Sequence, residues 1–513
     1  MDSGAPKVNR QMSPTAVSSG RGVSYLLLQN IASSASRVVA FAFFARLISV
    51  ADMGVFTILS LGYGAASAFI GLGLPSVVTK FVAENVAVGN KERAASVYYE
   101  ALVLTELVSI LIAVVFLLSK FPAGVSHLPN SAEVHVIGVF FAIDVVVSIG
   151  SVGAVGVLGL YEFKDYAVMY GVYNSFRPWL VVLLIYVVRS MVGLVAAWVI
   201  ADLALGVYQI VYLWRRLGPP VFKFDTKYLL KLSSPLYVSA IALFFYGSFD
   251  QLTLIPLVSL TALGVYGAVV SAFTAYSALI SVLGSVLLPA FSGVYGARGL
   301  DALRDSVGTA SRYVSMVAMP MAFALLAAAR PALTLLVGVG YAGGVVPLAV
   351  LVLASVCTII AVALSPVLIV LNETLLAALT SILPIPLSVV VALISIPVLG
   401  IVGAAIARAL SIILSLLLTW YFVQRKIPLR LDNEAIMKSV LASGVMALAM
   451  EAFQLLYYSR YLLPVYLAIG LAVYLLGMRT LRAVNVADMD LVRQMLGPRF
   501  GGVCDLLARV IVH

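Results

Sequence analysis

The chain alternates long apolar stretches with short polar segments. Each apolar stretch is close to the roughly 20 residues that an α-helix needs to cross the hydrocarbon of a bilayer. We predict membrane helices at residues 23–47, 55–79, 97–118, 134–158, 166–188, 192–214, 235–259, 264–289, 313–335, 345–371, 375–397, 401–423, 439–457 and 461–478. The pattern therefore predicts an all-α polytopic membrane protein with about 14 transmembrane helices.

The same pattern occurs twice along the chain, at an offset of 210 positions. The clearest matches pair Met53-Gly54-Val55-Phe56 with Leu263-Gly264-Val265-Tyr266, and Ser67-Ala68 with Ser277-Ala278. An even number of predicted helices separates the starts of the copies, so both copies have the same orientation and should be related by an axis along the membrane normal. A duplicated helix bundle is typical of transporters, with the substrate path between the copies.

The repeat and the loops predict six regions. They are a cytoplasmic N-terminal segment (1–22), an N-lobe of six helices (23–214), a basic cytoplasmic linker (215–234), a C-lobe of six helices (235–423), a further helix pair (424–478) and a cytoplasmic amphipathic tail (479–513). We expect the two lobes to be pseudo-symmetric.

Lys and Arg residues gather in alternate loops, which sets the orientation in a membrane. The exceptions on the opposite side are Arg46, Lys120, Arg189, Arg330 and Arg460. Because cytoplasmic loops carry the excess of positive charge, both termini are predicted to be cytoplasmic. Membrane lipids are therefore expected partners. The net charge of +10 belongs to short loops between helices, so a nucleic-acid partner is not indicated.

Composition excludes a soluble protein. The chain is 63% hydrophobic and 11% charged, with a mean hydropathy of +1.10, and so few charges could not cover the apolar surface in water. His127, His135 and His513 have no metal-ligand spacing, and there is no Gly-rich phosphate loop with Lys. We therefore predict no metal, no catalytic residue and no cofactor, and coupling to H⁺ or Na⁺ stays open.

Ionisable residues remain inside the predicted helices, away from their ends. They are Arg37, Glu106, Asp144, Arg177, Asp202, Asp250 and Arg408. A charge at this depth costs a few kcal/mol or more, so such residues normally face protein or water and are candidates for function. The alternative is that they form buried structural ion pairs.

Three of these residues extend polar faces of their helices. Asn30, Ser33, Ser34 and Arg37 form one stripe of the first predicted helix. The helix at 166–188 has a comparable face with Tyr170, Asn174 and Arg177. Arg408 occupies the repeat position of Trp198, one turn from Asp202.

This set of side chains favours an anionic substrate that is rich in hydroxyl groups. Arg binds phosphate bidentately and stays charged when it loses water, while Tyr and Asn suit sugar hydroxyls and the apolar faces of sugar rings. The acids Glu106, Asp144, Asp202 and Asp250 either bind a coupling H⁺ or Na⁺ or balance the buried arginines.

Several phrases resemble the polysaccharide-transport (oligosaccharide flippase) branch of the multidrug/oligosaccharidyl-lipid/polysaccharide (MOP) exporter superfamily. They include FFARLISVADMGVFTI (43–58), IGLGLPSVVTKFVAE (70–84), GLYEFKDYA (159–167), DQLTLIPLVSLTALGVYGAVVSA (250–272) and GIVGAAIARALS (400–411). The resemblance covers roughly residues 23–425. It implies alternating access by two six-helix lobes, and translocation of a lipid-linked oligosaccharide to the outer leaflet.

The resemblance also implies roles for particular residues and partners. In such flippases, cationic residues of the lobe-lining helices are thought to contact the substrate phosphate. Arg37 fits that role, and Arg177 and Arg408 fit it less securely. The substrate would be a phosphate- or pyrophosphate-linked oligosaccharide used for surface polysaccharide or glycoprotein synthesis, and glycan-assembly enzymes are expected as partners.

Two other readings stay open. A cation-coupled multidrug exporter of the same superfamily would need an acid-dominated cavity, against which the arginines argue. A membrane glycan-assembly enzyme or a scaffold is the other. Asp488-Met489-Asp490 matches the acidic pair with which glycosyltransferases hold a metal-bound sugar nucleotide. The motif lies in the short tail 479–513, which has no nucleotide-binding fold. We interpret it as a helix start at the membrane surface.

Overall fold

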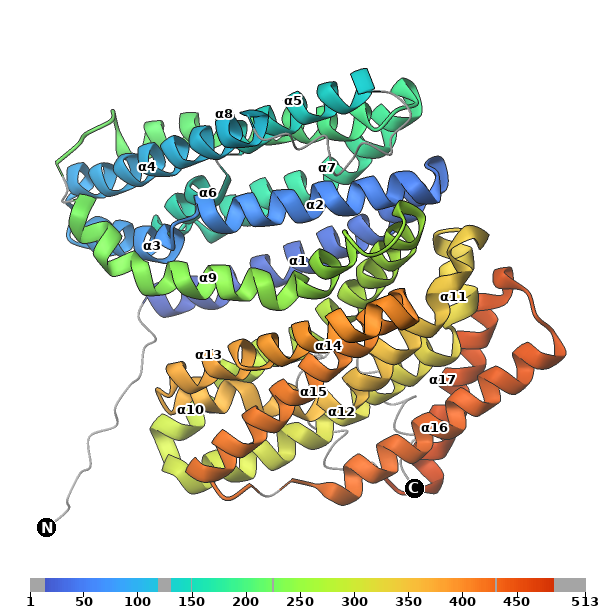
Figure 1. Cartoon of the computed structure of the whole chain (residues 1–513). Coiled ribbons are helices and arrows are strands. Elements are labelled where there is room, and N and C mark those ends of the chain that lie inside the picture. Colours follow the sequence, from blue (N-terminus) through green and yellow to red (C-terminus); the bar gives the residue numbers. More distant parts are fainter. Residues whose placement is uncertain (1–13, 119–130, 149, 224–225, 430, 484–513) are drawn as a thin grey trace, which may run out of the picture. The chain divides into compact units, whose positions relative to one another are not determined.

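The computed structural model describes residues 14–118, 131–148, 150–223, 226–429 and 431–483 (Figure 1). Within these residues the regular structure is helical and contains no strand, which confirms the predicted fold class. Long apolar runs explain the helices, because in hydrocarbon only a helix or a closed barrel satisfies its own backbone groups.

The helices of the first half follow one another closely. They are α1 (Pro14–Leu47), α2 (Val50–Ile70), α3 (Leu74–Ala87), α4 (Lys91–Leu118), α5 (Ser131–Val147), α6 (Gly150–Gly159), α7 (Phe163–Val188) and α8 (Val192–Leu217). The second half begins with α9 (Thr226–Leu254), α10 (Leu260–Ala327), α11 (Ala329–Leu336), η2 (Val339–Gly344) and α12 (Val345–Val370). It ends with α13 (Thr374–Ile382), α14 (Pro384–Leu399), α15 (Ile401–Lys426), α16 (Asn433–Leu456), η3 (Arg460–Leu462) and α17 (Leu463–Thr480).

Twelve stretches of the described residues are long and apolar enough to cross a membrane, by length and composition. α1 is not among them, and α10 runs through two predicted helices, 264–289 and 313–335. Within α10 the helical geometry breaks at Gly299, whose φ is 77°. These two differences explain why about 14 helices are predicted, whereas twelve stretches meet the length and composition for crossing a membrane.

The predicted single helix at 55–79 is wrong in detail, because the structure divides it. α2 ends at Ile70, and Leu72 and Gly73 both have positive φ before α3 begins. A Cβ atom at Gly73 would overlap the Ser233 carbonyl oxygen of α9. A close backbone approach therefore requires glycine here, and the break is the consequence.

Two further predicted helices are also divided. The stretch 134–158 is split between α5 and α6, and the stretch 375–397 is split between α13 and α14. The second break coincides with Pro384, which begins α14. Proline is tolerated in the first turn of a helix, where its missing N–H is not needed.

The chain forms two compact units, which we call unit 1 (residues 1–47 and 62–241) and unit 2 (residues 48–61 and 242–513). α2 and α9 each contribute residues to both units. In unit 1, α7 packs on α1 and α8, and α5 packs on α8. In unit 2, α12 packs on α10 and α15, and the helix pair α16–α17 packs together, with α16 on α10.

Each unit has its own apolar core. Unit 1 buries Leu74, Val78, Val82, Tyr98 and Leu213. In unit 2 one cluster includes Phe291, Leu303, Leu364 and Val367. A second cluster includes Met450 of α16 and Tyr466 of α17.

Unit 2 contains a close approach between repeat-related residues at the start of α2 and of α10. A Cβ atom added to Gly54 would overlap the Leu260 carbonyl oxygen, and one added to Gly264 would overlap the Val50 carbonyl oxygen. Gly264 lies 210 positions after Gly54, and Leu260 lies 210 positions after Val50. The two contacts are therefore equivalent under the internal repeat.

Lys223, after α8, and Thr226, at the start of α9, are both bonded to the first turns of α4. Ser96 Oγ accepts a hydrogen bond of 2.7 Å from the Lys223 backbone N–H, and Lys223 Nζ lies 2.6 Å from Glu92 Oε1. Thr226 Oγ1 donates to Glu100 at 3.0 Å. These bonds fix where α9 begins.

Candidate functional site

Asp202 on α8 places a buried carboxylate inside unit 1. Tyr63 of α2 donates a 3.1 Å hydrogen bond to Asp202 Oδ2, and Tyr173 of α7 donates to Oδ1. Arg177, one turn after Tyr173, donates to Oδ2 at 3.3 Å and places its Nε 3.3 Å from Oδ1. Charge-assisted hydrogen bonds of this kind are shorter and stronger than bonds between neutral groups.

Asp144 of α5 supplies a second carboxylate to the same cluster. It is 0% exposed, and its Oδ2 lies 4.0 Å from Arg177 Nη2. Within the described part of the chain, neither carboxylate oxygen of Asp144 has a hydrogen-bond partner. The cluster thus holds two acids around one guanidinium.

Aromatic rings surround the Arg177 guanidinium. Its central carbon lies 5.0 Å from the Tyr63 ring, 5.1 Å from the Trp198 ring and 5.8 Å from the Tyr173 ring. Rings at this range stabilise a desolvated cation through their negative faces. Arg177 is therefore held by its own unit on all of these sides.

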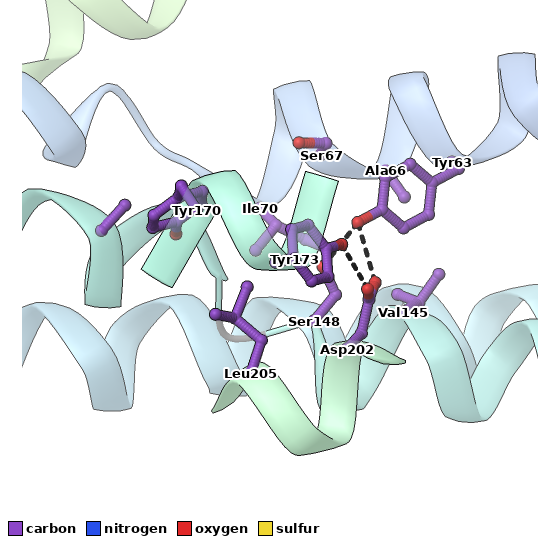
Figure 2. A pocket seen from close by; sticks show the side chains of 11 residues that line it. Tyr63, Ala66, Ser67, Ile70, Val145, Ser148, Tyr170, Tyr173, Asp202 and Leu205 are labelled. Carbon is purple, nitrogen blue, oxygen red and sulfur yellow. Dashed lines mark hydrogen bonds between the residues drawn. The ribbon is translucent and has the colours of Figure 1, made fainter. Parts of the chain in front are cut away.

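A pocket of about 260 Å³ opens beside this cluster within unit 1. Figure 2 shows the hydroxyls of Tyr63 and Tyr173 directed at the Asp202 carboxylate in its wall. The other lining residues are Ala66, Ser67, Ile70, Val145, Ser148, Ala154, Tyr170 and Leu205. The wall is thus rich in tyrosine and hydroxyl groups with one carboxylate, and Arg177 is not part of it.

Two of the lining residues are held by further hydrogen bonds. Tyr170 accepts a 2.8 Å hydrogen bond from Gln209 Nε2 of α8, and Ser148 Oγ lies 3.1 Å from the Tyr63 hydroxyl. Asn174, predicted to share a face with Tyr170, donates to the Tyr170 carbonyl at 2.9 Å and does not line the pocket.

In unit 2, the Arg408 guanidinium pairs with the single buried carboxylate of Asp250. Arg408 Nη1 of α15 donates to both oxygens of Asp250 at 2.8 and 2.7 Å, and Nη2 donates to the Gly247 carbonyl of α9 at 2.6 Å. The Tyr266 hydroxyl donates to Asp250 at 2.5 Å. Asp250 is 0% exposed, and its charge is balanced within the unit.

Arg37 differs from the other two predicted arginines. It is exposed on α1, and its Nη2 donates to Ser34 Oγ at 3.0 Å. Among the described residues, no carboxylate forms an ion pair with it. Asn30 is also exposed, whereas Ser33 is buried and donates to the Gln29 carbonyl at 2.7 Å. The predicted stripe therefore has exposed members, Asn30 and Arg37, and a buried member, Ser33.

α1 is fixed against α7 beside this stripe. Ser36 donates to the Ser175 carbonyl at 3.0 Å and accepts from Trp179 Nε1 at 3.1 Å. Glu106, the remaining predicted acid, lies apart on α4. It is half-buried and accepts from Ser109 at 3.3 Å, with no ion pair among the described residues.

Sequence reasoning missed Tyr63, Ser148, Gln209 and Tyr266 as members of the buried clusters. Tyr63, Gln209 and Tyr266 do not belong to a polar stripe of their apolar helices, and Ser148 directly follows α5. Tyr266 carried one signal, because it occupies the repeat position of Phe56. The described residues contain no group of three His, Cys, Asp or Glu that could hold a metal ion. Asp488 and Asp490 lie outside the described residues.

The fold is shared with transporters of the MOP superfamily. A lipid II flippase, MurJ, in an inward closed conformation superposes with a TM-score of 0.69 at 14% identity, covering 88% of this chain and 98% of that chain. An inward-facing multidrug resistance MATE family transporter of the MOP superfamily gives 0.59 at 14% identity, covering 77% and 94%. A MATE transporter from Vibrio cholerae gives 0.56 at 14% identity, covering 80% and 96%.

These likenesses define the class: a helical, multi-pass membrane protein with the MOP transporter fold. Residues 19–294 match the family model described as polysaccharide biosynthesis protein, and the chain belongs to that family. A search of curated proteins finds no match.

Proposed function

We propose that this protein is a transporter, not an enzyme, and that it moves a phosphate- or pyrophosphate-linked oligosaccharide from the inner to the outer leaflet. The observation that carries the proposal is membership of the polysaccharide biosynthesis family combined with a fold shared with a lipid II flippase. Transport proceeds by alternating access and serves surface polysaccharide or glycoprotein synthesis. Both termini are cytoplasmic, so the substrate comes from the side where Lys and Arg concentrate.

Arg37 is our candidate for the phosphate contact. Arg177 and Arg408 are each engaged by buried carboxylates of their own unit, at 3.3 and 2.7 Å. Arg37 keeps an exposed guanidinium beside the exposed amide of Asn30. A guanidinium without an acid partner can offer paired donors to a phosphate.

The pocket of unit 1 is our candidate for sugar contacts. Tyr170 and Tyr173 lie at a ring-centroid distance of 6.2 Å in its wall, with Ser67 and Ser148 as hydroxyl donors nearby. Aromatic faces stack on the apolar faces of sugar rings, while hydroxyls bond to their edges. Glycan-assembly enzymes are proposed as neighbours in the membrane, because they would supply the substrate.

A cation-coupled multidrug exporter is the second candidate. The observation that favours it is the Asp202 carboxylate in the pocket wall, since a carboxylate and aromatic rings together also suit an organic cation.

Transbilayer movement of a labelled lipid-linked oligosaccharide in proteoliposomes tests the proposal. The native chain should move the lipid, and Arg37→Ala should lose most of that movement, while Arg37→Lys keeps part of it. Arg298→Ala, an exposed basic residue of α10, is the matched control and should behave as native.

Three results would change this view. Movement that Arg37→Ala leaves intact would reject the phosphate contact and keep the function. Uptake of an organic cation without movement of any lipid-linked glycan would favour the exporter. Glycan assembly that needs the chain but involves no lipid movement in liposomes would favour a scaffold.

A further inference from the structure

The pocket of unit 1 has room for only a small ligand. Its volume of about 260 Å³ lies just below the roughly 300–1,000 Å³ of sites that enclose drug-sized molecules. The described residues that line it all belong to unit 1. A space of this size encloses one sugar ring with its substituents rather than a chain of sugars. One unit of an oligosaccharide therefore fits, with the rest of the glycan outside.

Part of the pocket wall is apolar. Tyr170 and Tyr173 of α7 contribute aromatic rings whose centroids lie 6.2 Å apart, edge to face. Ile70, Val145 and Leu205 add aliphatic groups (Figure 2). A sugar ring presents C–H groups on its face and hydroxyls at its edge. The apolar part of this wall therefore suits the face of the ring.

The polar part of the wall is rich in hydrogen-bond acceptors. Tyr63 gives its hydroxyl hydrogen to Asp202 at 3.1 Å, and Tyr173 donates to the other oxygen of the same carboxylate. Because a tyrosine hydroxyl has one hydrogen, these two oxygens can only accept further hydrogen bonds. Ser148 Oγ, 3.1 Å from the Tyr63 hydroxyl, is accordingly the donor of that pair. A ligand with several O–H or N–H donors suits such a wall.

The pocket offers no positive charge to a ligand. The described residues that line it include no Lys, Arg or His. The buried guanidinium of Arg177 is not part of the wall, and it is engaged with Asp202 at 3.3 Å and lies 4.0 Å from Asp144. A carboxylate or phosphate only accepts hydrogen bonds, so it would lose its water here without gaining a charged donor.

We propose that this pocket binds one uncharged sugar unit of the lipid-linked oligosaccharide and excludes acidic sugars, an inference that rests on the proposed transport function. The sugars that fit are neutral hexoses and N-acetylated amino sugars, whose hydroxyls and amide N–H are donors. The sugar and the phosphate of the substrate are then recognised by different groups, the sugar by the pocket and the phosphate by Arg37.

Saturation-transfer NMR of the purified protein tests the pocket without any transport. Methyl glucoside and methyl glucuronide are matched probes, because they differ only at the sixth carbon, which is a hydroxymethyl group in one and a carboxylate in the other. The native protein should bind the glucoside about tenfold more tightly or better, since a desolvated carboxylate finds no charged donor. Equal or tighter binding of the glucuronide would overturn the proposal. Binding of tetramethylammonium but of neither glycoside would overturn it in favour of the exporter.

Ser67 allows the preference to be reversed by one substitution. It lines the pocket and its side chain is exposed, so a change there leaves the buried contacts in place. Ser67→Lys adds an ammonium group and should bind the glucuronide at least as tightly as the glucoside. Ser67→Asn, which stays neutral, and Ser234→Lys, at an exposed position of α9, should keep the native preference. An unchanged preference in Ser67→Lys would place sugar binding elsewhere and refute the proposal.

Proteoliposomes extend the test to transport. Two lipid-linked oligosaccharides that differ in one sugar, neutral in the first and acidic in the second, should move at rates that differ several-fold in favour of the first. Ser67→Lys should narrow that difference. Equal native rates would refute selection by the pocket and leave the flippase intact. No movement of either lipid would contradict the proposed function, and the NMR result would still decide the sugar site.

Discussion

Asp250 and Arg408 show how strongly two buried charges depend on each other. Arg408 gives Asp250 two hydrogen bonds, at 2.7 and 2.8 Å, in a fully buried place. We expect Arg408→Gln to lower the free energy of unfolding by about 3–5 kcal/mol, because it leaves the buried Asp250 carboxylate without its charged partner. Thermal unfolding in detergent measures the loss.

The double variant Asp250→Asn with Arg408→Gln is the control for that loss. It removes both charges and keeps the shapes of the side chains, so much of the stability should return. If Arg408→Gln unfolds at the native temperature, or the double variant is no better than the single one, the pair does not act as described.

In contrast to Arg408, Arg37 should contribute little to the free energy of unfolding. Its side chain is exposed and its described contact is one hydrogen bond to Ser34. Arg37→Ala should therefore change the free energy of unfolding by no more than about 0.5 kcal/mol, as for other surface substitutions. The same thermal measurement checks it, and a large loss would mean that Arg37 is structural.

At the scale of helices, the close approach of α2 and α10 depends on Gly54 and Gly264. Each lies against a backbone carbonyl of the other helix, so a side chain has no space. We expect Gly54→Leu and Gly264→Leu each to destabilise the protein by about 1–3 kcal/mol or more. The atoms in the way are backbone carbonyls, which move aside less easily than the ends of side chains. Gly293→Leu in α10, where nothing lies within 4 Å, is the matched control.

The repeat makes the comparison of these two variants informative. The contacts are equivalent under the 210-position offset, so the losses should be similar in size. A large loss at one glycine and none at the other would show that the two contacts are not energetically equivalent.

At the scale of the whole molecule, the proposed orientation can be checked by labelling. Cys357 and Cys504 are first replaced by Ser. A membrane-impermeant maleimide should then label Tyr457→Cys, at the end of α16, from outside intact cells. Lys91→Cys, at the start of α4, should react only after the membrane is opened, because its loop carries the basic residues typical of the cytoplasmic side. The reverse pattern would invert the topology.

The candidate site could be predicted only in part. Arg177, Asp202, Asp250 and Arg408 stood out because charges are rare in apolar helices. Their partners did not, since Arg408 meets an acid 158 positions away, and no periodicity relates the two. Tyr63 gave no signal at all, because a single tyrosine in an apolar helix is ordinary.

The breaks in the helices could not be predicted from hydropathy either. Apolar character continues through Ile70, Leu72 and Leu74, so hydropathy alone predicts one helix at 55–79. The turn at Gly73 exists because α9 approaches its backbone there. The distant residue Ser233, rather than the local pattern, decides that boundary.

By itself the sequence determined that this is a helical membrane protein with an internal repeat, and which positions carry charge in its helices. Those properties follow from the apolar length of each segment and from the cost of charge in hydrocarbon, which are local quantities. Only the tertiary structure decided that Asp250 is neutralised, that Asp144 is not, and that Arg37 is exposed. The reason is that the energy of a buried charge depends on which helices bring other groups within a few ångströms of it.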